Sequence, residues 1–186
     1  MSNSARAQLA DLLRTHSVRQ GRFELSSGEV SDVYVDVKST SLTGAGADLI
    51  GRLLFELVAD LDPRPEGIGG LTLGADPLVT AVSLTAHLQG TDLAALIVRK
   101  EAKGHGTGRA IEAPPTLEKG ARVVAVDDVV TTGGSTLVAI EAMRQAGFVV
   151  EDAVCVVDRQ AQGRQALADA GVTLHALYAL DELLEP

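Results

Sequence analysis

Five short runs of apolar residues, most of them separated by helical segments, occupy the chain from residue 67 onward. Continuous Val, Ile and Leu runs without polar alternation are typical of strands covered on both faces. Strands that alternate with helices favour a parallel sheet joined by right-handed crossovers. The sequence therefore predicts an α/β fold with a central, mostly parallel sheet flanked by helices. The expected strands cover residues 68–73, 93–98, 122–130, 148–157 and 172–180, with helices at 76–89, 134–146 and 163–170.

The N-terminal third carries elements outside this alternation. Apolar residues at helical spacing predict helices over residues 4–16 and 46–61, and the second helix ends at the proline-punctuated connector 62–67. Between these helices, an alternating pattern over residues 23–37, interrupted by a Ser-Ser-Gly turn, predicts a hairpin. We expect these elements to be added to the α/β core.

Length, charge and cysteine content bound the possible functions. With 186 residues and 46% hydrophobic content, we expect a single domain over residues 1–186 with its core in 67–180. A formal net charge of -9 gives no general attraction to nucleic acid or to an anionic membrane. The single Cys155 lies in an apolar run and is compatible with a reducing cytosol. No segment approaches the ~20 apolar residues of a membrane span, so we expect a soluble, cytoplasmic protein without nucleic-acid or membrane partners.

The most informative segment reads VVAVDDVVTTGGST over residues 123–136. An apolar strand delivers Asp127 and Asp128 to its carboxyl end, where open parallel sheets bind ligands. The following turn opens a helix whose N-terminal N–H groups favour a phosphate. The carboxylates would instead accept hydrogen bonds from sugar hydroxyls or help to hold a cation. The pattern indicates a phosphorylated sugar, although a strand end followed by a helix cap would also account for these residues.

A basic, glycine-rich loop follows the strand expected at residues 93–98. Residues 99–109 read RKEAKGHGTGR and contain two of the four lysines of an acidic chain. Ordering such a loop costs backbone entropy, so we expect its cations to meet an anion that comes and goes. The alternative is a solvated basic hairpin tip.

The chain resembles a known enzyme family at several of these places. Residues 123–136 resemble the phosphoribosyl-pyrophosphate signature of type I phosphoribosyltransferases, and RKEAKGHG resembles the catalytic loop of one group, the orotate phosphoribosyltransferases. Further matches are Phe23-x-Leu25-x-Ser27-Gly28, Ser31-x-x-Tyr34-x-Asp36 and Val157-Asp158-Arg159. The resemblance implies the type I phosphoribosyltransferase fold, with a small hood formed by about residues 1–40 and C-terminal residues. It also implies transfer of the 5-phosphoribosyl group from phosphoribosyl pyrophosphate to orotate. The products are orotidine 5'-monophosphate and pyrophosphate, in pyrimidine (UMP) biosynthesis.

The resemblance further implies the residues of the site. Catalysis is implied for Lys100, Lys103, His105 and Asp128. Orotate binding is implied for Phe23, Thr131 and Arg159. Binding of phosphoribosyl pyrophosphate is implied for Arg99, Lys100, Lys103, His105, Asp127, Asp128, Val129, Val130, Thr131, Thr132, Gly133, Gly134 and Ser135.

Mg²⁺ is the implied cofactor, held mainly by the substrate and not by a set of protein side chains. The implied assembly is a homodimer in which loop 99–109 is shared between subunits. Arg99, Lys103 and His105 would then act in the neighbouring site, while Lys100 would serve its own subunit.

Two positions depart from the family pattern. Leu73 and Ser26 stand where relatives often carry lysine. Because both replacements remove positive charge, Lys100 and Lys103 are expected to be the main lysines available to pyrophosphate. A purine or other phosphoribosyltransferase and a non-catalytic regulator that binds the same ligand remain alternatives. The first would need neither the RKEAKGHG loop nor Arg159, and the second would usually add a nucleic-acid-binding surface, for which the sequence shows no basic patch or spare domain.

Overall fold

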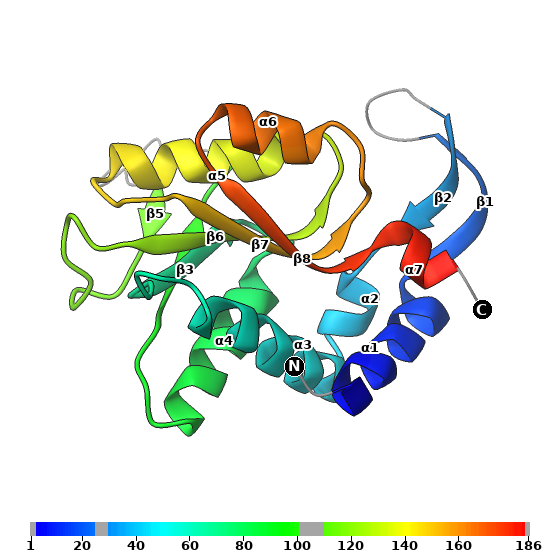
Figure 1. The fold of residues 1–186 in the computed structure, drawn as a ribbon, viewed down its shortest axis with the longest axis horizontal. Helices are drawn as coiled ribbons and strands as arrows, with labels where there is room; N and C mark the ends of the chain where they lie inside the picture. Colours follow the sequence, from blue (N-terminus) through cyan, green and yellow to red (C-terminus); the bar gives the residue numbers. More distant parts are fainter. Residues whose placement is uncertain (1–2, 25–29, 101–109, 185–186) are drawn as a thin grey trace.

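The structure is a computed structural model, and it describes residues 3–24, 30–100 and 110–184. Figure 1 shows a central sheet with helices on both faces. The sheet has six strands in the order β5-β4-β3-β6-β7-β8. Their bounds are β3 Gly67–Leu71, β4 Ala94–Val98, β5 Ile111–Glu112, β6 Val123–Val130, β7 Asp152–Asp158 and β8 Thr173–Ala179. All neighbours pair in parallel except β5, which pairs antiparallel with β4 at the edge. The predicted α/β fold is confirmed.

Helices cover both faces of this sheet. On one face lie α3 (Gly44–Ala59) and α4 (Asp76–Leu88), and on the other lie α5 (Gly134–Gln145) and α6 (Gly163–Asp169). Each face has its own apolar cluster, centred on α3 and α4 in one case and on α5 and α6 in the other. Strands buried from both sides explain why their sequences are continuous apolar runs.

The chain order within the sheet reverses between β3 and β6. From β3 the chain moves outward to β4 and β5, and then returns to β6 on the other side of β3. The two strands approach closely where β3 ends, because a Cβ added at Gly70 would lie 2.2 Å from the carbonyl oxygen of Val126. Glycine is therefore required at position 70. In open α/β sheets such a reversal point opens a ligand crevice at the carboxyl ends of the strands.

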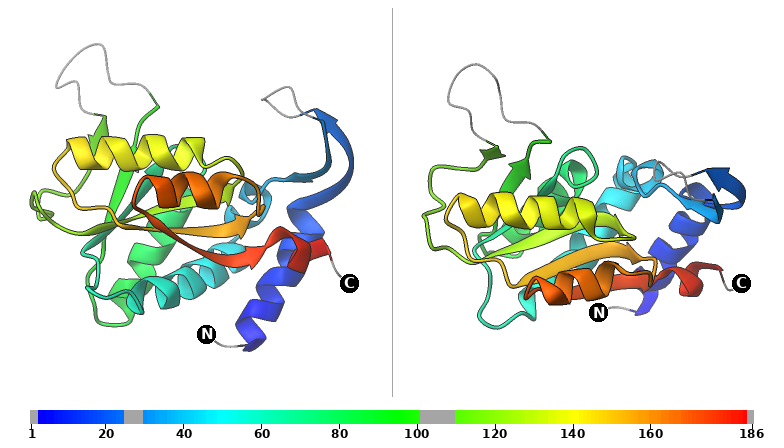
Figure 2. Two further views of the ribbon diagram at one scale, coloured as in Figure 1. Left: turned by 45° about the horizontal axis from the view of Figure 1, so that its top comes forward. Right: turned by 90° about the horizontal axis from the view of Figure 1, so that it is seen from above.

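An N-terminal unit packs beside the carboxyl end of the sheet. It consists of α1 (Asn3–His16), the antiparallel pair β1 (Val18–Glu24) and β2 (Val30–Val35), and α2 (Lys38–Ser41). Figure 2 shows the β1–β2 pair standing out from the sheet. The C-terminal helix α7 (Leu180–Leu184) packs against α1, where Arg6 forms a 2.7 Å ion pair with Glu182. The N- and C-terminal segments therefore lie together.

Some elements differ from the sequence-based prediction. The helix α2, the edge strand β5 and the helix α7 were not predicted, because each is five residues or shorter and carries no full period. The strand expected from residue 148 begins at Asp152. Before that point the chain forms one isolated bridge, between Val149 and Arg122. No helix in the described segments is long and apolar enough to cross a membrane.

Candidate active site

The predicted carboxylates lie at the reversal point of the sheet. Asp127 and Asp128 stand near the carboxyl end of β6, beside the loop that leaves β3. A Cβ added at Gly74 in that loop would lie 2.9 Å from Oδ1 of Asp128. The loop backbone therefore runs directly against the Asp128 carboxylate, and the two segments form one wall of the crevice.

Asp127 is turned into the protein and is only 6% exposed. Its Oδ2 accepts hydrogen bonds from Thr136 Oγ1 at 2.7 Å and from Ser135 Oγ at 3.0 Å. Its Oδ1 accepts the backbone N–H of Asp128 at 3.0 Å. Burial raises the pKa of Asp127 to about 6; the Thr136 hydroxyl lowers it, and the charge of Asp128 adds to the increase. In this arrangement Asp127 braces the turn that follows β6.

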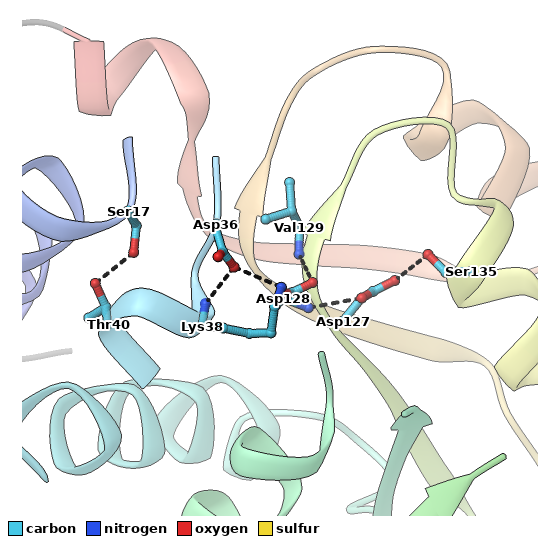
Figure 3. Close-up of polar contacts among 8 residues, drawn as sticks. All are labelled: Ser17, Asp36, Lys38, Thr40, Asp127, Asp128, Val129 and Ser135. Atoms are coloured by element: carbon cyan, nitrogen blue, oxygen red, sulfur yellow. Dashed lines mark hydrogen bonds and ion pairs between the residues drawn. The ribbon is translucent and has the colours of Figure 1, made fainter. Parts of the chain in front are cut away.

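Asp128 faces the crevice and meets a lysine there. Its Oδ1 accepts the backbone N–H of Val129 at 2.9 Å, and its Oδ2 lies 3.5 Å from Nζ of Lys38. The same Nζ lies 2.7 Å from Oδ1 of Asp36. Figure 3 shows the two carboxylates on either side of the lysine ammonium. Asp128 is thus a hydrogen-bond acceptor beside a cation at the mouth of the site.

The turn after β6 has the form of an anion site. Gly133 adopts a left-handed backbone, with φ of 79°, and caps the N-terminus of α5. The first N–H groups of a helix lack intrahelical partners and favour an anion. The carbonyl of Thr131 accepts the N–H of Gly163 at 2.9 Å, which fixes the turn to α6. The predicted phosphate-binding positions of this segment run without a break from the end of β6 (Val129, Val130) through the turn (Thr131, Thr132, Gly133) to the first residues of α5 (Gly134, Ser135).

Arg159 lies between β7 and the N-terminal unit. Its Nη2 donates to Ser31 Oγ at 2.9 Å and to the carbonyl of Val33 at 3.3 Å. Ser31 pairs directly with Phe23 across the β1–β2 ladder. The structure therefore brings together Arg159 and Phe23, two of the three residues predicted to bind orotate, although they are far apart in the sequence.

The described start of the basic loop, Arg99 and Lys100, follows the carboxyl end of β4. Arg99 pairs with Glu112 of β5 through Nε at 3.0 Å and Nη2 at 2.5 Å, and Lys100 follows it as an exposed residue. Lys103 and His105 lie outside the described residues. The in-trans roles of Arg99, Lys103 and His105 stay predictions.

Sequence reasoning missed Lys38. The Lys38 ammonium lies 3.5 Å from the Asp128 carboxylate, and the contact could not be foreseen because only the packing of α2 against the core brings residues 38 and 128 together. That Lys100 and Lys103 are the main lysines available to pyrophosphate stays a prediction. The scarcity of lysine was a usable signal: Lys38 follows the matched Asp36 by two residues.

Two further observations concern ligands. Within the described segments, no group of three or more His, Cys, Asp or Glu side chains could hold a metal ion. A hollow of about 940 Å³ lies between α4 and the amino ends of β3 and β4, and is lined by residues such as Thr80, His87 and Asp92. We do not assign the predicted chemistry to this hollow, because none of its lining residues belongs to the crevice at Asp128.

Comparison with known proteins agrees with this geometry. The family model "Phosphoribosyl transferase domain" matches residues 41–176. The orotate phosphoribosyltransferase of Thermosynechococcus vestitus is 48% identical over 178 residues, which cover 96% of this chain and 92% of the relative. The chain belongs to the orotate phosphoribosyltransferase family.

Solved structures of this family share the fold. The Mycobacterium tuberculosis orotate phosphoribosyltransferase in complex with Fe(III) dicitrate superposes with a TM-score of 0.82 at 42% identity, over 96% of this chain and 98% of that one. The same Mycobacterium tuberculosis enzyme in complex with 5-phospho-alpha-D-ribosyl 1-diphosphate gives a TM-score of 0.79 at 37% identity, over 97% of this chain and 99% of that one. Family membership makes the chain a phosphoribosyltransferase and removes the purine enzyme as the leading alternative.

Proposed function

We propose that this chain transfers the 5-phosphoribosyl group from phosphoribosyl pyrophosphate to orotate, giving orotidine 5'-monophosphate and pyrophosphate in pyrimidine biosynthesis. One observation carries the proposal. The Asp127–Asp128 pair and the anion-binding turn before α5 lie at the reversal point of the sheet, with Arg159 and the β1–β2 pair beside them. A sugar phosphate and a carboxylated base would occupy adjacent parts of this crevice.

The ribose phosphate is assigned to β6 and the turn. Backbone N–H groups of Thr131 to Ser135 would bind the 5'-phosphate, since a helix N-terminus favours an anion. Asp128 is well placed to accept a ribose hydroxyl, because its Oδ2 faces Lys38 across 3.5 Å. Asp127 is proposed to contact the ribose as well, and its bonds to Ser135 and Thr136 also support an indirect role through the turn.

The base is assigned to Arg159, Thr131 and Phe23. A guanidinium matches the planar geometry of a carboxylate, and Arg159 already lies in hydrogen-bond contact with the strand that pairs with Phe23. Orotate would exchange the Ser31 and Val33 contacts of Arg159 for its own carboxylate. This assignment distinguishes orotate from purine bases, which carry no carboxylate.

The chemistry requires stabilisation of charge. Breaking the anomeric C–O bond leaves positive charge on the ribose and negative charge on pyrophosphate, so fixed dipoles and cations lower the barrier. Arg99, Lys100, Lys103 and His105 are proposed to surround the leaving group and exclude water. Mg²⁺, when bound with the diphosphate, would supply further positive charge. Substrate is proposed to hold that ion, because Asp128 already faces a lysine and no cluster of three candidate ligands occurs in the described segments.

The assembly is proposed to be a homodimer that shares loop 99–109. Exposed leucines on α4 support this, since Leu84 and Leu88 are 56% and 76% exposed and lie one helical turn apart. A single domain over 1–186 and a cytoplasmic location also stay predictions.

The deciding experiment is an assay with separate bases. The purified chain is incubated with phosphoribosyl pyrophosphate, Mg²⁺ and either orotate, adenine or guanine, and nucleotide and pyrophosphate are quantified. We expect product with orotate only, and the reverse reaction from orotidine 5'-monophosphate and pyrophosphate. Turnover of a purine without turnover of orotate would contradict the proposal.

A further inference from the structure

Lys38 lies between two carboxylates of the site, those of Asp36 and Asp128. Its Nζ lies 2.7 Å from Asp36 Oδ1 and 3.5 Å from Asp128 Oδ2 (Figure 3). Its backbone N–H also donates to Asp36 Oδ1, at 3.2 Å. Asp36 therefore tethers Lys38 at two points, while the contact with Asp128 is longer than a direct charge-assisted hydrogen bond.

The difference between the two distances has a chemical consequence. A lysine seated fully on Asp128 would occupy the carboxylate oxygen that a sugar hydroxyl needs. Because the Lys38 ammonium lies closer to Asp36, Oδ2 of Asp128 can still accept a hydrogen bond from a ligand while it lies beside a positive charge. The side chain of Asp128 is 14% exposed and that of Lys38 is 43% exposed, so both are open to a ligand at the crevice mouth.

Local charge also favours a role for this lysine. Asp127 and Asp128 are adjacent carboxylates, and across the described part of the chain Lys38 is the only cation within 4 Å of Asp128. Burial acts to lower the pKa of Lys38, but the hydrogen bond to Asp36 and the charge of Asp128 raise it above its ordinary value. The ammonium therefore stays charged at neutral pH.

We propose that Lys38 is a positioning residue for phosphoribosyl pyrophosphate, whose ammonium holds the Asp128 carboxylate oriented toward the ribose hydroxyls. This inference rests on the proposed function. The β3 loop contacts Asp128 through Gly74, while the cation beside Asp128 comes from α2. Lys38 thus connects the N-terminal unit to the ribose part of the site.

A purely structural reading makes a different prediction. In that reading Asp36 and Lys38 only fix the start of α2, and replacing Lys38 would lower the stability of the fold without a selective effect on one substrate. Measuring affinity for phosphoribosyl pyrophosphate, affinity for orotate and thermal stability on the same variants therefore distinguishes a positioning role of Lys38 from a purely structural one.

The test compares Lys38→Met, Lys38→Arg and Asp36→Asn with a matched control, Lys119→Met, which removes an exposed lysine far from Asp128. Binding of phosphoribosyl pyrophosphate with Mg²⁺ is measured by calorimetry, and steady-state kinetics give KM for each substrate. We expect Lys38→Met to weaken binding of phosphoribosyl pyrophosphate by about tenfold, the loss expected for one interaction with a charged group. In Lys38→Met, KM for orotate should stay at the wild-type value. The control variant should bind both substrates like the wild type, and Lys38→Arg should recover most of the affinity for phosphoribosyl pyrophosphate.

The outcomes are separable. If the wild type binds phosphoribosyl pyrophosphate but does not turn over orotate, the proposed function fails and the binding measurement still tests Lys38. Wild-type affinity for phosphoribosyl pyrophosphate in Lys38→Met, or an equal rise in KM for both substrates, overturns the role of Lys38. Should Lys38→Met not fold, Asp36→Asn decides, because releasing the tether should weaken binding of phosphoribosyl pyrophosphate and leave KM for orotate unchanged.

Discussion

Asp127→Asn tests whether the buried carboxylate of the site carries an energetic cost. Burial raises the pKa of Asp127 from 3.8 to about 6, so the folded protein binds a proton at this residue more tightly than the unfolded chain does. Stability from this group is therefore full below about pH 4 and is lost as pH rises toward the folded value. A shift of about two pKa units corresponds to about 3 kcal/mol at ~1.4 kcal/mol per unit.

The substitution keeps the shape of the side chain but removes its titration. Asparagine also replaces an acceptor of two hydroxyl hydrogen bonds, from Ser135 and Thr136, which adds a constant loss at every pH. The informative quantity is consequently how the difference in unfolding free energy between the wild type and Asp127→Asn changes with pH. Between about pH 4 and about pH 7.5, the wild type should lose about 2–3 kcal/mol relative to Asp127→Asn.

Urea unfolding at a series of pH values measures this difference directly. Thermal unfolding should show the same trend as a relative shift of about 5–10 °C for a chain of this length. Asp92→Asn is the control, because Asp92 is exposed and forms no ion pair among the described residues, and its curve should run parallel to the wild type. Parallel curves for Asp127→Asn as well would refute the reasoning that burial controls this carboxyl group.

Three further predictions follow from contacts described above. Gly70→Ala should lower the free energy of unfolding by about 2–3 kcal/mol, since its Cβ would lie 2.2 Å from the Val126 carbonyl, whereas Gly44→Ala, with no atom within 4 Å, should change urea unfolding little. Arg159→Lys should raise KM for orotate about tenfold or more and leave KM for phosphoribosyl pyrophosphate unchanged, because lysine loses the planar pairing; equal effects on both would contradict the assignment. Leu84→Glu should convert the proposed dimer to monomer in sedimentation, and an unchanged mass would remove α4 from the interface.

The sheet was predictable because burial on both faces leaves a strong pattern. The apolar run over Arg122–Val130 and the helix after Gly133 were placed to within a residue, since the carboxylates and the Thr/Gly/Ser turn mark where strand becomes helix. The run from Phe148 was read as strand four residues too early, because apolar character continues there while pairing does not. Apolar pattern reports burial, and only the partner strand decides where a ladder begins.

The site was predictable in part for the same reason. Asp127, Asp128 and Arg159 follow apolar strands, so their position at one edge of the sheet could be derived from strand order. Lys38 could not be derived in this way, because its contact with Asp128 depends on how a four-residue helix packs against the sheet. The opposite orientations of Asp127 and Asp128 follow from the alternation of side chains along a strand, but the structure was needed to show that Asp128 is the one that faces the crevice.

The short β4–β5 ladder sets a limit on where loop 99–109 can act. Ile97 pairs with Glu112, Val98 pairs with Ile111, and the N–H of Arg99 donates to the Ala110 carbonyl at 2.8 Å, so the two ends of the loop meet at one point. Ten residues that leave and return to that point extend at most five residues outward, or roughly 17 Å at about 3.4 Å per residue. Any leaving group served by this loop, in the same subunit or in a neighbour, must therefore come within that radius, plus the length of one side chain, of the β4–β5 stem.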